Sequence, residues 1–441
     1  MDTVLTLTKK IIPKPIFTFF QPYYHFLLAY VGAVRYRHPS RELMVIGVTG
    51  TKGKSSTTEL LAHILRANGH KVASLSTIQF SIDNETERNL YKMTMPGRFF
   101  VQKFLRQSVD AGCTHAVVEM TSEGAKQSRH KFINIDALIF TNLTPEHIES
   151  HGSFEKYKQA KLSIAKAVAR SPKRPRCLVA NTDDEHGQDF LDFEVEHKLP
   201  YSLSDIELYS LQKDSVSLVI DNTTIRVPLV GLFNVYNALA AITLARQFGI
   251  SLELIRDALR DLPPLKGRVE HFVSPAGADK HVTAVVDYAH TPDSLTKLYE
   301  AFPDKYKVCV LGNTGGGRDT WKRPEMGAIA ENYCDHIILT DEDPYDEDPS
   351  AIVEAMRNGM GEDAPVEIIM DRRAAIGRAV AIAPHGSYIL ISGKGTDPYI
   401  MGPNGTRTKW SDAKVAEEAL ARLTQETEKS EPEETATTDH S

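Results

Sequence analysis

The stretch that most constrains the fold of this chain is residues 45–56, which read VIGVTGTKGKSS. An apolar run, a glycine-rich turn and a helix expected from Lys54 to about Asn68 are typical of a phosphate-binding loop. The glycines let successive N–H groups turn inward, and the helix N-terminus adds positive potential. Lys54 can then reach outer phosphates and the Ser55 hydroxyl can ligate Mg²⁺. Val48 stands where the strict Walker spacing has glycine, so the pattern is a T-G-T-x-G-K-[ST] variant. The alternative is a glycine-rich turn with a chance lysine.

Composition narrows the class of protein. A chain of 441 residues with 41% hydrophobic and 25% charged residues fits a globular protein of two or three domains. The net charge of −7 gives no general reason to expect a nucleic-acid partner. The four cysteines form no CxxC pair, so we expect neither a disulfide framework nor a zinc site, as fits a reducing cytoplasm.

The N-terminal segment is unusual because residues 15–34 carry no lysine, arginine or carboxylate and are rich in aromatic side chains. Its length is near that of a membrane span, but Pro22 interrupts it. Basic residues on both sides, such as Lys14 and Arg35, would suit a segment that lies in a membrane interface. Three interpretations stay open: a helix that packs on the first domain, a membrane-surface contact, and a span.

Strand-like and helix-like segments alternate along the chain, which predicts parallel sheets covered by helices. Residues 78–92 look irregular, residues 201–228 alternate like antiparallel strands, and Pro263-Pro264 indicates a hinge. Residues 425–441 are rich in Glu, Thr and Ser and predict a disordered tail. The expected strands are 71–77, 116–120, 137–142, 177–181, 283–287, 307–311, 336–340 and 388–392, and the expected helices include 99–111, 154–169, 234–248, 252–261 and 412–424.

Polar side chains follow the predicted strands of the first half. Glu119 ends one strand, His147 lies just past the next, and Lys161 lies on the helix after that. Ligands of open parallel sheets bind at the carboxyl ends of strands, so these groups are candidates for a Mg²⁺ site beside the phosphate loop. From spacing alone, Glu119 as a helix cap and His147 as a surface residue remain as open as the metal site. Spacing alone favours Lys161 as a solvated helix lysine.

An ordered series of motifs over residues 45 to about 420 resembles the Mur ligase family, and within it the MurE-like branch that adds the third residue of the muramyl peptide. The motifs are Thr49-Gly50-Thr51-x-Gly53-Lys54, Glu119-Met120-Thr121-Ser122, Thr141-Asn142-Leu143-Thr144-Pro145-Glu146-His147, His151-Gly152-Ser153-Phe154-Glu155-x-Tyr157-x-x-Ala160-Lys161, Gly231-x-Phe233-Asn234-x-x-Asn237-Ala238, Gly267-Arg268-Val269-Glu270, Asp287-Tyr288-Ala289-His290-Thr291-Pro292-Asp293 and Lys322-Arg323-Pro324.

The resemblance implies an α/β protein with a P-loop parallel-sheet central ATPase domain over residues 43–264. A Rossmann-like α/β C-terminal domain would follow over residues 265–424 and close on the first about the proline hinge. Residues 1–42 would be a short aromatic segment in place of the family's uridine-binding domain, and residues 425–441 a disordered acidic tail.

The resemblance also implies the reaction. ATP phosphorylates a substrate carboxylate, and an amino group attacks the acyl phosphate to give an amide, ADP and phosphate. The acceptor would be a UDP-muramyl-dipeptide of peptidoglycan precursor synthesis, and the added amino acid would be of the diaminopimelate or lysine type.

The site residues carry over position by position. The catalytic residues would be Lys54, Lys161, His147 and Glu119. Mg²⁺ would be held by Ser55, Glu119, His147 and Lys161, the last as a carbamate formed with CO₂. ATP would contact Thr49, Gly50, Thr51, Lys52, Gly53, Lys54, Ser55, Ser56, Asn237, Arg268, Asp287, His290 and Asp319. The two other substrates would contact Thr94, Ser122, Arg129, Arg323, Asp343, Pro344, Tyr345, Gly393 and Asp397.

Several positions depart from the family pattern. Lys52 replaces the usual Asn, and Glu146 replaces an Asp before His147. Thr121-Ser122-Glu123 stands for Ser-Ser-His, Glu342-Asp343-Pro344-Tyr345 for Asp-Asn-Pro-Arg, and Gly393-Lys394-Gly395-Thr396-Asp397 for Gly-Lys-Gly-His-Glu. Tyr345 thus replaces the arginine that grips the distal carboxylate of diaminopimelate, so the added amino acid stays open among diaminopimelate, lysine and other diamino acids.

Two other functions remain as alternatives: a ligase of the folylpolyglutamate or poly-amino-acid type, and a non-catalytic nucleotide-binding scaffold. The run Asp287–Asp293 argues against the first, and the intact lysine, carboxylate and histidine set argues against the second. We expect a cytoplasmic monomer that handles small molecules and no nucleic acid. A peripheral membrane contact through residues 11–36 is left open.

Overall fold

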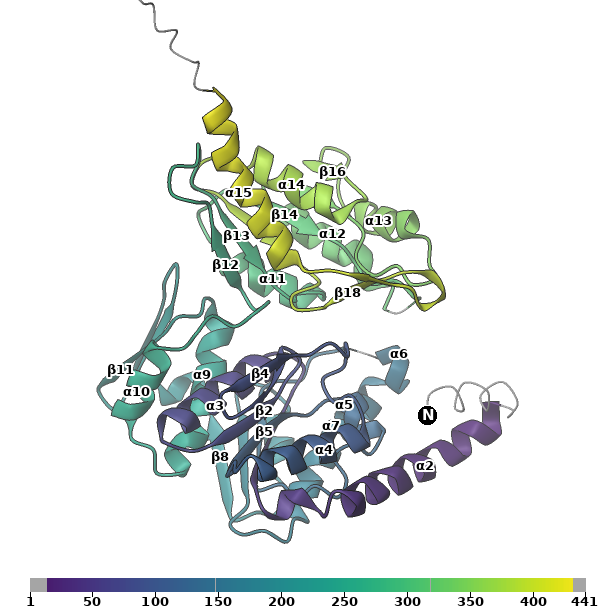
Figure 1. Ribbon diagram of the computed structural model, residues 1–441, viewed down its shortest axis with the longest axis vertical. Helices are drawn as coiled ribbons and strands as arrows, with labels where there is room; N and C mark the ends of the chain where they lie inside the picture. The colour runs from purple at the N-terminus through teal and green to yellow at the C-terminus, as the bar shows by residue number, and fades with distance from the viewer. Residues whose placement is uncertain (1–13, 147, 318, 431–441) are drawn as a thin grey trace, which may run out of the picture. The chain divides into compact units, whose positions relative to one another are not determined.

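The computed structural model describes residues 14–146, 148–317 and 319–430. The predictions for His147 and for residues 431–441 therefore lie outside the described residues. The chain divides between Pro264 and Leu265 into two compact units (Figure 1).

The first unit is built on a sheet whose described part has eight strands. Six neighbouring strands are parallel, and a hairpin adds two antiparallel strands at one edge. In spatial order the strands are β4 (Glu85–Arg88), β3 (Gln79–Ile82), β2 (Val72–Leu75), β5 (His115–Glu119), β1 (Met44–Thr49), β6 (Ala137–Phe140), β7 (Cys177–Asn181) and β8 (His197–Tyr201). The predicted parallel sheet is confirmed.

The register of the three central strands explains where the site forms. Val48 of β1 pairs with Glu119 of β5, and Thr49 pairs with Phe140 of β6. The strands therefore end at the same level, and the segments that follow them emerge together at one edge of the sheet.

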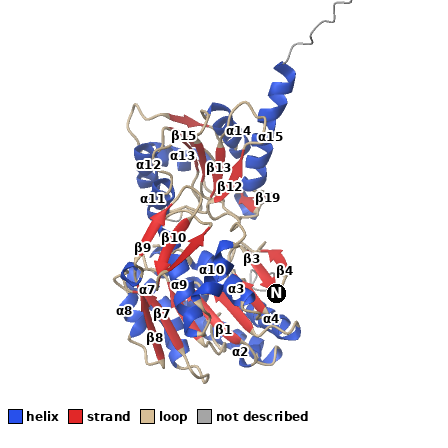
Figure 2. Cartoon of the chain, turned by 90° about the vertical axis from the view of Figure 1, so that its left-hand side faces the viewer, coloured by secondary structure: helices blue, strands red, loops and turns tan. Residues whose placement is uncertain are grey.

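Helices cover both faces of this sheet, and a small antiparallel sheet completes the unit (Figures 1 and 2). Apolar side chains of α4 and α7 form one core with Val45, Val118 and Leu138, while α3 packs against α9 and α10. The helices are α2 (Lys14–Arg35), α3 (Lys54–Ala67), α4 (Arg98–Asp110), α5 (Ser122–Lys126), α6 (Ile148–His151), α7 (Phe154–Ala169), α8 (Gly187–Leu191), α9 (Leu232–Gln247) and α10 (Leu252–Arg260), with short turns η1 (Pro39–Arg41) and η2 (Leu203–Asp205). The small sheet contains β9 (Leu208–Leu211), β10 (Val216–Ile220) and β11 (Thr223–Val227).

Some predictions for secondary structure are wrong. Residues 78–92 contain the hairpin of β3 and β4, which turns at Asp83 with a φ of 52°. Every residue of β4 is exposed, so its sequence carries no apolar alternation. Strand β8 was also not predicted. In the second unit, the last helix continues to Ser430, so residues 425–430, expected to be disordered, are helical.

The second unit contains a six-stranded sheet within its described residues, and all of its strands are parallel except the edge strand β12. The four strands predicted here are confirmed. In spatial order the strands are β12 (Glu270–Val273), β13 (Thr283–Val286), β17 (Tyr388–Ile391), β14 (Lys307–Leu311), β15 (His336–Leu339) and β16 (Val366–Ile368). The remaining elements are α11 (Pro292–Glu300), α12 (Lys322–Tyr333), α13 (Pro349–Arg357), α14 (Arg372–Ile382), α15 (Asp412–Ser430), the hairpin β18 (Tyr399–Met401) and β19 (Arg407–Lys409), and η3 (Pro403–Gly405).

The expectation of no disulfide is wrong, because Cys309 and Cys334 are bonded. Cys309 lies in β14, and Cys334 follows α12 just before β15, the parallel neighbour of β14. Strand pairing thus brings together two cysteines that lie 25 residues apart, with 6.1 Å between their Cα atoms. Cys113 and Cys177 are free and buried.

The aromatic N-terminal segment forms α2, which packs against α4 of the first unit. Ala29 and Ala33 are buried in this contact. Among the described residues, no helix is long and apolar enough to cross a membrane. The interpretation of α2 as a span is therefore wrong, while packing on the first unit is confirmed.

Candidate functional site

The loop between β1 and α3 requires glycine at two positions. Gly50 and Gly53 have φ values of 148° and 81°. A Cβ on Gly53 would lie 2.1 Å from Oδ1 of Asn237, and a Cβ on Gly50 would lie 1.9 Å from Oγ1 of Thr141. The loop is therefore held closely by the segment after β6 and by α9.

Three side chains gather where α3 begins. The Ser55 hydroxyl donates to Oε2 of Glu119 over 2.8 Å, and Nζ of Lys54 lies 4.0 Å from Oε1 of the same carboxylate. Glu119 is almost fully buried. It also accepts from the backbone N–H and the hydroxyl of Thr77, over 2.8 and 3.1 Å. The predicted neighbours Lys54, Ser55 and Glu119 are thus together at the phosphate loop. Their hydroxyl and carboxylate oxygens are the donors that Mg²⁺ prefers.

Lys161 of α7 is buried beneath the same loop. Its Nζ donates to the carbonyl oxygen of Gly50 and lies 4.8 Å from the centre of the Tyr157 ring. Burial, together with the nearby Lys54 cation, holds the pKa of Lys161 well below its usual range. The interpretation of Lys161 as a solvated surface lysine is therefore wrong.

Lys52 and Glu146, which both depart from the family pattern, contact each other. Nζ of Lys52 lies 2.9 Å from Oε1 of Glu146, and Glu146 is largely buried. The backbone N–H of Lys52 also donates to Oδ1 of Asn142 over 2.8 Å. The added cation of the loop is thus matched by a carboxylate from the segment that follows β6.

We expect the Lys52–Glu146 pair to contribute about 1 kcal/mol to the free energy of unfolding, because Glu146 is shielded from water. In urea unfolding, Lys52→Asn and Glu146→Gln should show a coupling of that size in a double-mutant cycle. The more exposed pair Lys198–Glu194 is the control and should show coupling near zero. Additive effects of Lys52→Asn and Glu146→Gln would contradict the pairing.

Asn237, predicted to contact ATP, lies on α9 against the loop. Its Oδ1 accepts from the Thr57 hydroxyl over 3.4 Å, and its Nδ2 donates to Asn234 over 2.9 Å. Asn237 therefore contacts the start of α3, although the two lie 180 residues apart in the sequence.

The predicted acceptor residues of the first unit lie near the same strand ends. The hydroxyl groups of Thr94 and Thr77 are 2.6 Å apart, and Thr77 in turn contacts Glu119. Ser122 is buried in the first turn of α5. Arg129 donates to the carbonyl oxygen of Met95 and, over 2.8 Å, to Oε1 of Gln127. Thr94 is thereby linked to Glu119 through Thr77.

The second unit holds the other predicted ATP residues. Asp287 accepts from the backbone N–H groups of Val269 and Ala289, over 2.9 and 2.7 Å. The Arg268 guanidinium lies 4.6 Å from the centre of the Tyr288 ring. The backbone carbonyl of His290 accepts from Nζ of Lys322 over 2.9 Å. Asp319 precedes α12 with a φ of 45°.

The residues predicted to bind the added amino acid lie in two clusters of charged side chains within the second unit. Arg323, in the first turn of α12, makes a bidentate contact with Glu347 at 2.6 and 2.9 Å. Nζ of Lys394 is fully buried and donates to Oδ1 of Asp343 over 2.9 Å. Asp397 lies 3.5 Å from the same Nζ. Each predicted cation or carboxylate named here thus has an opposite charge nearby.

Gly393 and Glu342 also fit closely. A Cβ on Gly393, whose φ is 106°, would lie 2.1 Å from Oε2 of Glu342. Burial raises the pKa of Glu342, and within the described residues its Oε2 has no hydrogen-bond partner. Pro344 and Tyr345 follow, and Tyr345 has a φ of 53°.

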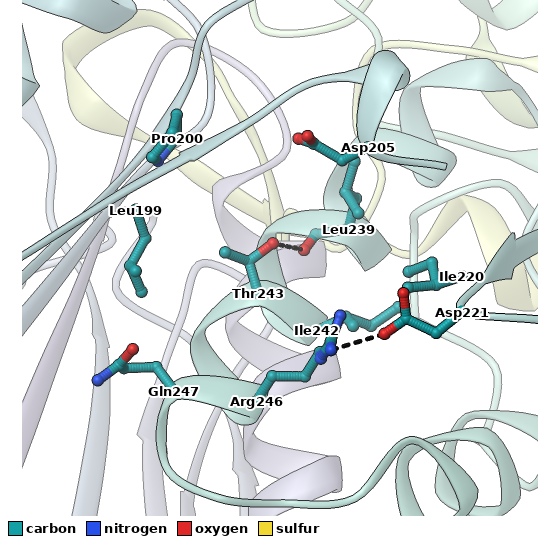
Figure 3. A pocket seen from close by; sticks show the side chains of 10 residues that line it. All are labelled: Leu199, Pro200, Asp205, Ile220, Asp221, Leu239, Ile242, Thr243, Arg246 and Gln247. Carbon is teal, nitrogen blue, oxygen red and sulfur yellow. Dashed lines mark hydrogen bonds and ion pairs between the residues drawn. The ribbon is translucent and has the colours of Figure 1, made fainter. Parts of the chain in front are cut away.

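A separate hollow of about 490 Å³ lies in the first unit, and it contains none of the predicted site residues (Figure 3). At its wall Arg246 pairs with Asp221 over 2.7 Å, and the Thr243 hydroxyl donates to the carbonyl oxygen of Leu239. The Arg246, Asp221 and Thr243 side chains are therefore engaged within the wall, and we place the candidate site at the phosphate loop.

In each unit, sequence reasoning missed residues that contact the predicted site residues. Thr77 holds Glu119, Tyr157 contacts the Thr51 hydroxyl at 2.9 Å, and Glu347 contacts Arg323. The Tyr157 position was within a quoted motif. Thr77 lies at the end of a predicted strand, so strand-end position was a usable signal for it, whereas no local pattern marks Glu347.

Family models match both units. The model of the Mur ligase middle domain matches residues 48–245, and that of the Mur ligase glutamate ligase domain matches residues 267–395. A UDP-N-acetylmuramyl-tripeptide synthetase of Roseiflexus sp. is 35% identical over 90% of this chain and 82% of the relative. The chain belongs to the Mur ligase family. A UDP-N-acetylmuramoyl-L-alanyl-D-glutamate–2,6-diaminopimelate ligase of Bacillus cereus is 34% identical over 89% of this chain and 81% of the relative.

Solved structures agree with this membership. A structure of UDP-N-acetylmuramoyl-L-alanyl-D-glutamate–2,6-diaminopimelate ligase is 28% identical, covers 89% of this chain and 82% of its own, and has a TM-score of 0.59. The Mycobacterium tuberculosis folylpolyglutamate synthase has a TM-score of 0.67 at 18% identity, over 84% of this chain and 93% of its own. That second likeness shows the fold alone.

Proposed function

We propose that this Mur ligase family member is an ATP-dependent amide ligase that adds a diamino acid to a UDP-muramyl-dipeptide. The observation that carries the proposal is the set of Lys54, Ser55, Glu119 and buried Lys161 around one phosphate loop. Names of relatives at 35% and 34% identity, which describe tripeptide synthesis and diaminopimelate ligation, support the substrate class.

The proposed roles follow from charge and position. Nζ of Lys54 and the N-terminus of α3 would neutralise the phosphates as the terminal phosphoryl group moves to the substrate carboxylate. Ser55 and Glu119 would supply two oxygen ligands for Mg²⁺, which usually retains several waters and phosphate oxygens. The described residues contain no group of three or more His, Cys, Asp or Glu that could hold a metal by itself. We therefore propose that the protein supplies only part of the Mg²⁺ coordination, through Ser55, Glu119 and His147, and that phosphate and water oxygens supply the rest.

Lys161 would contribute as a carbamate. A neutral amine attacks CO₂, the new N–C bond forms and one proton leaves, so a cationic side chain becomes an anionic oxygen donor. The lowered pKa of Lys161 favours the neutral amine that this step needs. The proposal therefore explains why a lysine is buried beside a second lysine at a phosphate loop.

The remaining predicted residues would bind substrates. Asn237 from the first unit and Arg268, Asp287, His290 and Asp319 from the second are proposed for ATP. Thr94, Ser122 and Arg129 are proposed for the carboxylates of the acceptor peptide. Arg323 would take the α-carboxylate of the incoming amino acid in exchange for Glu347, since a guanidinium binds carboxylates bidentately.

A second group is proposed to select the added amino acid. Tyr345 lacks the positive charge needed to bind a second carboxylate of the added amino acid. Asp343, Gly393 and Asp397 lie on the loops proposed to meet the amino groups of that amino acid.

We further propose a cytoplasmic location, with a peripheral contact between residues 11–36 and the membrane.

The deciding experiment measures phosphate release with ATP, Mg²⁺ and UDP-muramyl-dipeptide across a panel of amino acids. We expect turnover with diaminopimelate or lysine and none above background with alanine or glutamate. A buried polar or charged side chain that is left without its substrate partner typically lowers kcat/KM tenfold or more. We therefore expect kcat/KM for a diamino acid to exceed that for alanine or glutamate by at least about 100-fold. Release that requires a folate and glutamate instead would contradict the proposal, as would no release with any diamino acid.

A further inference from the structure

The outer face of α2 exposes a continuous row of large apolar side chains. We propose that this face binds the surface of an anionic phospholipid bilayer, with α2 lying in the plane of the interface. Its exposed members include Tyr23 at 66%, Leu27 at 58% and Val31 at 43% exposure. The row is Phe20, Tyr23, Tyr24, Leu27, Tyr30 and Val31. Phe26 and Val34 are exposed at its border, and the rings of Phe26 and Tyr30 also contact Phe132. Binding through this face specifies the membrane contact proposed above and does not depend on the ligase reaction.

The inner face of the helix holds this row in place. Ala29 and Ala33 are buried against the first unit, and α2 packs on α4. At the start of α4, Arg98 donates from Nη2 to Nδ1 of His25 and from Nε to the carbonyl oxygen of Gln127, the latter over 3.0 Å. Because these contacts occupy the inner face, the apolar row cannot turn inward without breaking them.

Charge indicates which surface α2 meets. Residues 1–42 contain six lysines and arginines against two carboxylates, whereas the whole chain has a net charge of −7. Arg35, Arg37 and Arg41 are exposed beyond the end of the apolar row, and Lys9, Lys10 and Lys14 precede it in the sequence. Basic residues on both flanks of an apolar face complement anionic headgroups while the apolar side chains enter the acyl boundary.

The aromatic content indicates the depth of binding. Tyrosine rings are amphipathic and favour the headgroup level, and no described helix could cross the bilayer. On the inner side of α2, Oε1 of Gln127 accepts from Arg98 over 3.3 Å and from the proposed acceptor residue Arg129 over 2.8 Å.

The test measures co-sedimentation of the full chain with vesicles. We expect binding to phosphatidylcholine vesicles that contain phosphatidylglycerol, weaker binding to phosphatidylcholine alone, and weakening with added salt. The variant Leu27→Ser/Val31→Ser/Val34→Ser should bind at least about tenfold more weakly, because three apolar side chains no longer enter the interface. The control Leu208→Ser/Leu211→Ser changes exposed leucines of β9 and should bind like the original chain.

Two further measurements make each outcome decisive. Arg35→Gln/Arg37→Gln should reduce the salt dependence, because two of the six basic residues are lost, and should keep the weak binding to uncharged vesicles. Circular dichroism and phosphate release should be unchanged in all these variants, which separates loss of binding from misfolding or from failure of the ligase proposal. Equal binding of the triple-serine variant, or no binding of the original chain, overturns the inference. A dimer in analytical ultracentrifugation that the triple-serine variant converts to a monomer would instead assign this face to a second copy.

Discussion

Replacing Lys161 with alanine is expected to lower the rate of amide formation by about 1,000-fold, the loss typical of one preorganised charge-stabilising group. Lys161 is buried, donates to the carbonyl oxygen of Gly50 and has a pKa well below its usual range. The amine is therefore placed to carry a carbamate at the phosphate loop. Phosphate release and formation of the amide product measure the effect.

Lys166→Ala is the matched control, because Lys166 is exposed on the same helix. It should leave turnover unchanged. Added bicarbonate should restore part of the activity of Lys161→Ala by filling the space of the lost carboxylate. Incubation with ¹³C-labelled bicarbonate should give a carbamate signal in NMR of the original chain and none in Lys161→Ala. Turnover of Lys161→Ala close to that of the original chain would defeat the carbamate proposal.

The sequence predicts the parallel core of both units because buried strands leave an unambiguous pattern. Strands β1, β5 and β6 are apolar runs that end in glycine or polar residues, and the glycine-rich turn identifies the helix that follows. The hairpin of β3 and β4 could not be predicted in this way. Its outer strand is exposed throughout, so pairing with its neighbour, and not burial of a face, holds it in the sheet.

The candidate site was predictable where its residues follow strands of one sheet. Glu119 and Ser55 meet because β1 and β5 end at the same level. Contacts between distant segments were not predictable from local pattern. Lys52 and Glu146 each depart from the family pattern, and only the structure shows that Glu146 lies 2.9 Å from the Nζ of Lys52. The disulfide likewise depends on the pairing of β14 with β15, and cysteine spacing alone does not reveal it.

Exposure along α2 could not be predicted from its composition either. An apolar segment between basic residues is compatible with a packed helix, a surface helix and a span, although Pro22 disfavours the span. The structure separates these cases, because Ala29 and Ala33 are buried while Leu27 and Val31 are exposed. Small residues on the inner face permit close packing on α4, and the larger ones are left outside.

Replacing Lys54 with alanine is expected to reduce ATP-dependent phosphate release by at least about 1,000-fold, comparable to the loss of Lys161. Lys54 begins α3, its Nζ donates to the carbonyl oxygen of Thr51 over 2.8 Å, and the same Nζ lies 4.0 Å from Glu119. It is the lysine that the loop variant assigns to the outer phosphates, whereas Lys52 is paired with Glu146. Lys52→Asn is therefore the matched control.

The contrast between the two lysines tests the assignment of the loop. Lys52→Asn should retain turnover within about tenfold, because it alters an ion pair beside the loop and leaves Lys54 in place. Lys54→Ala should also weaken ATP binding in calorimetry, since the charge that faces the phosphates is lost. Unchanged phosphate release in Lys54→Ala would disprove the phosphate-loop assignment. A larger loss in Lys52→Asn than in Lys54→Ala would transfer the phosphate-binding role to Lys52 and make Glu146 the residue that positions it.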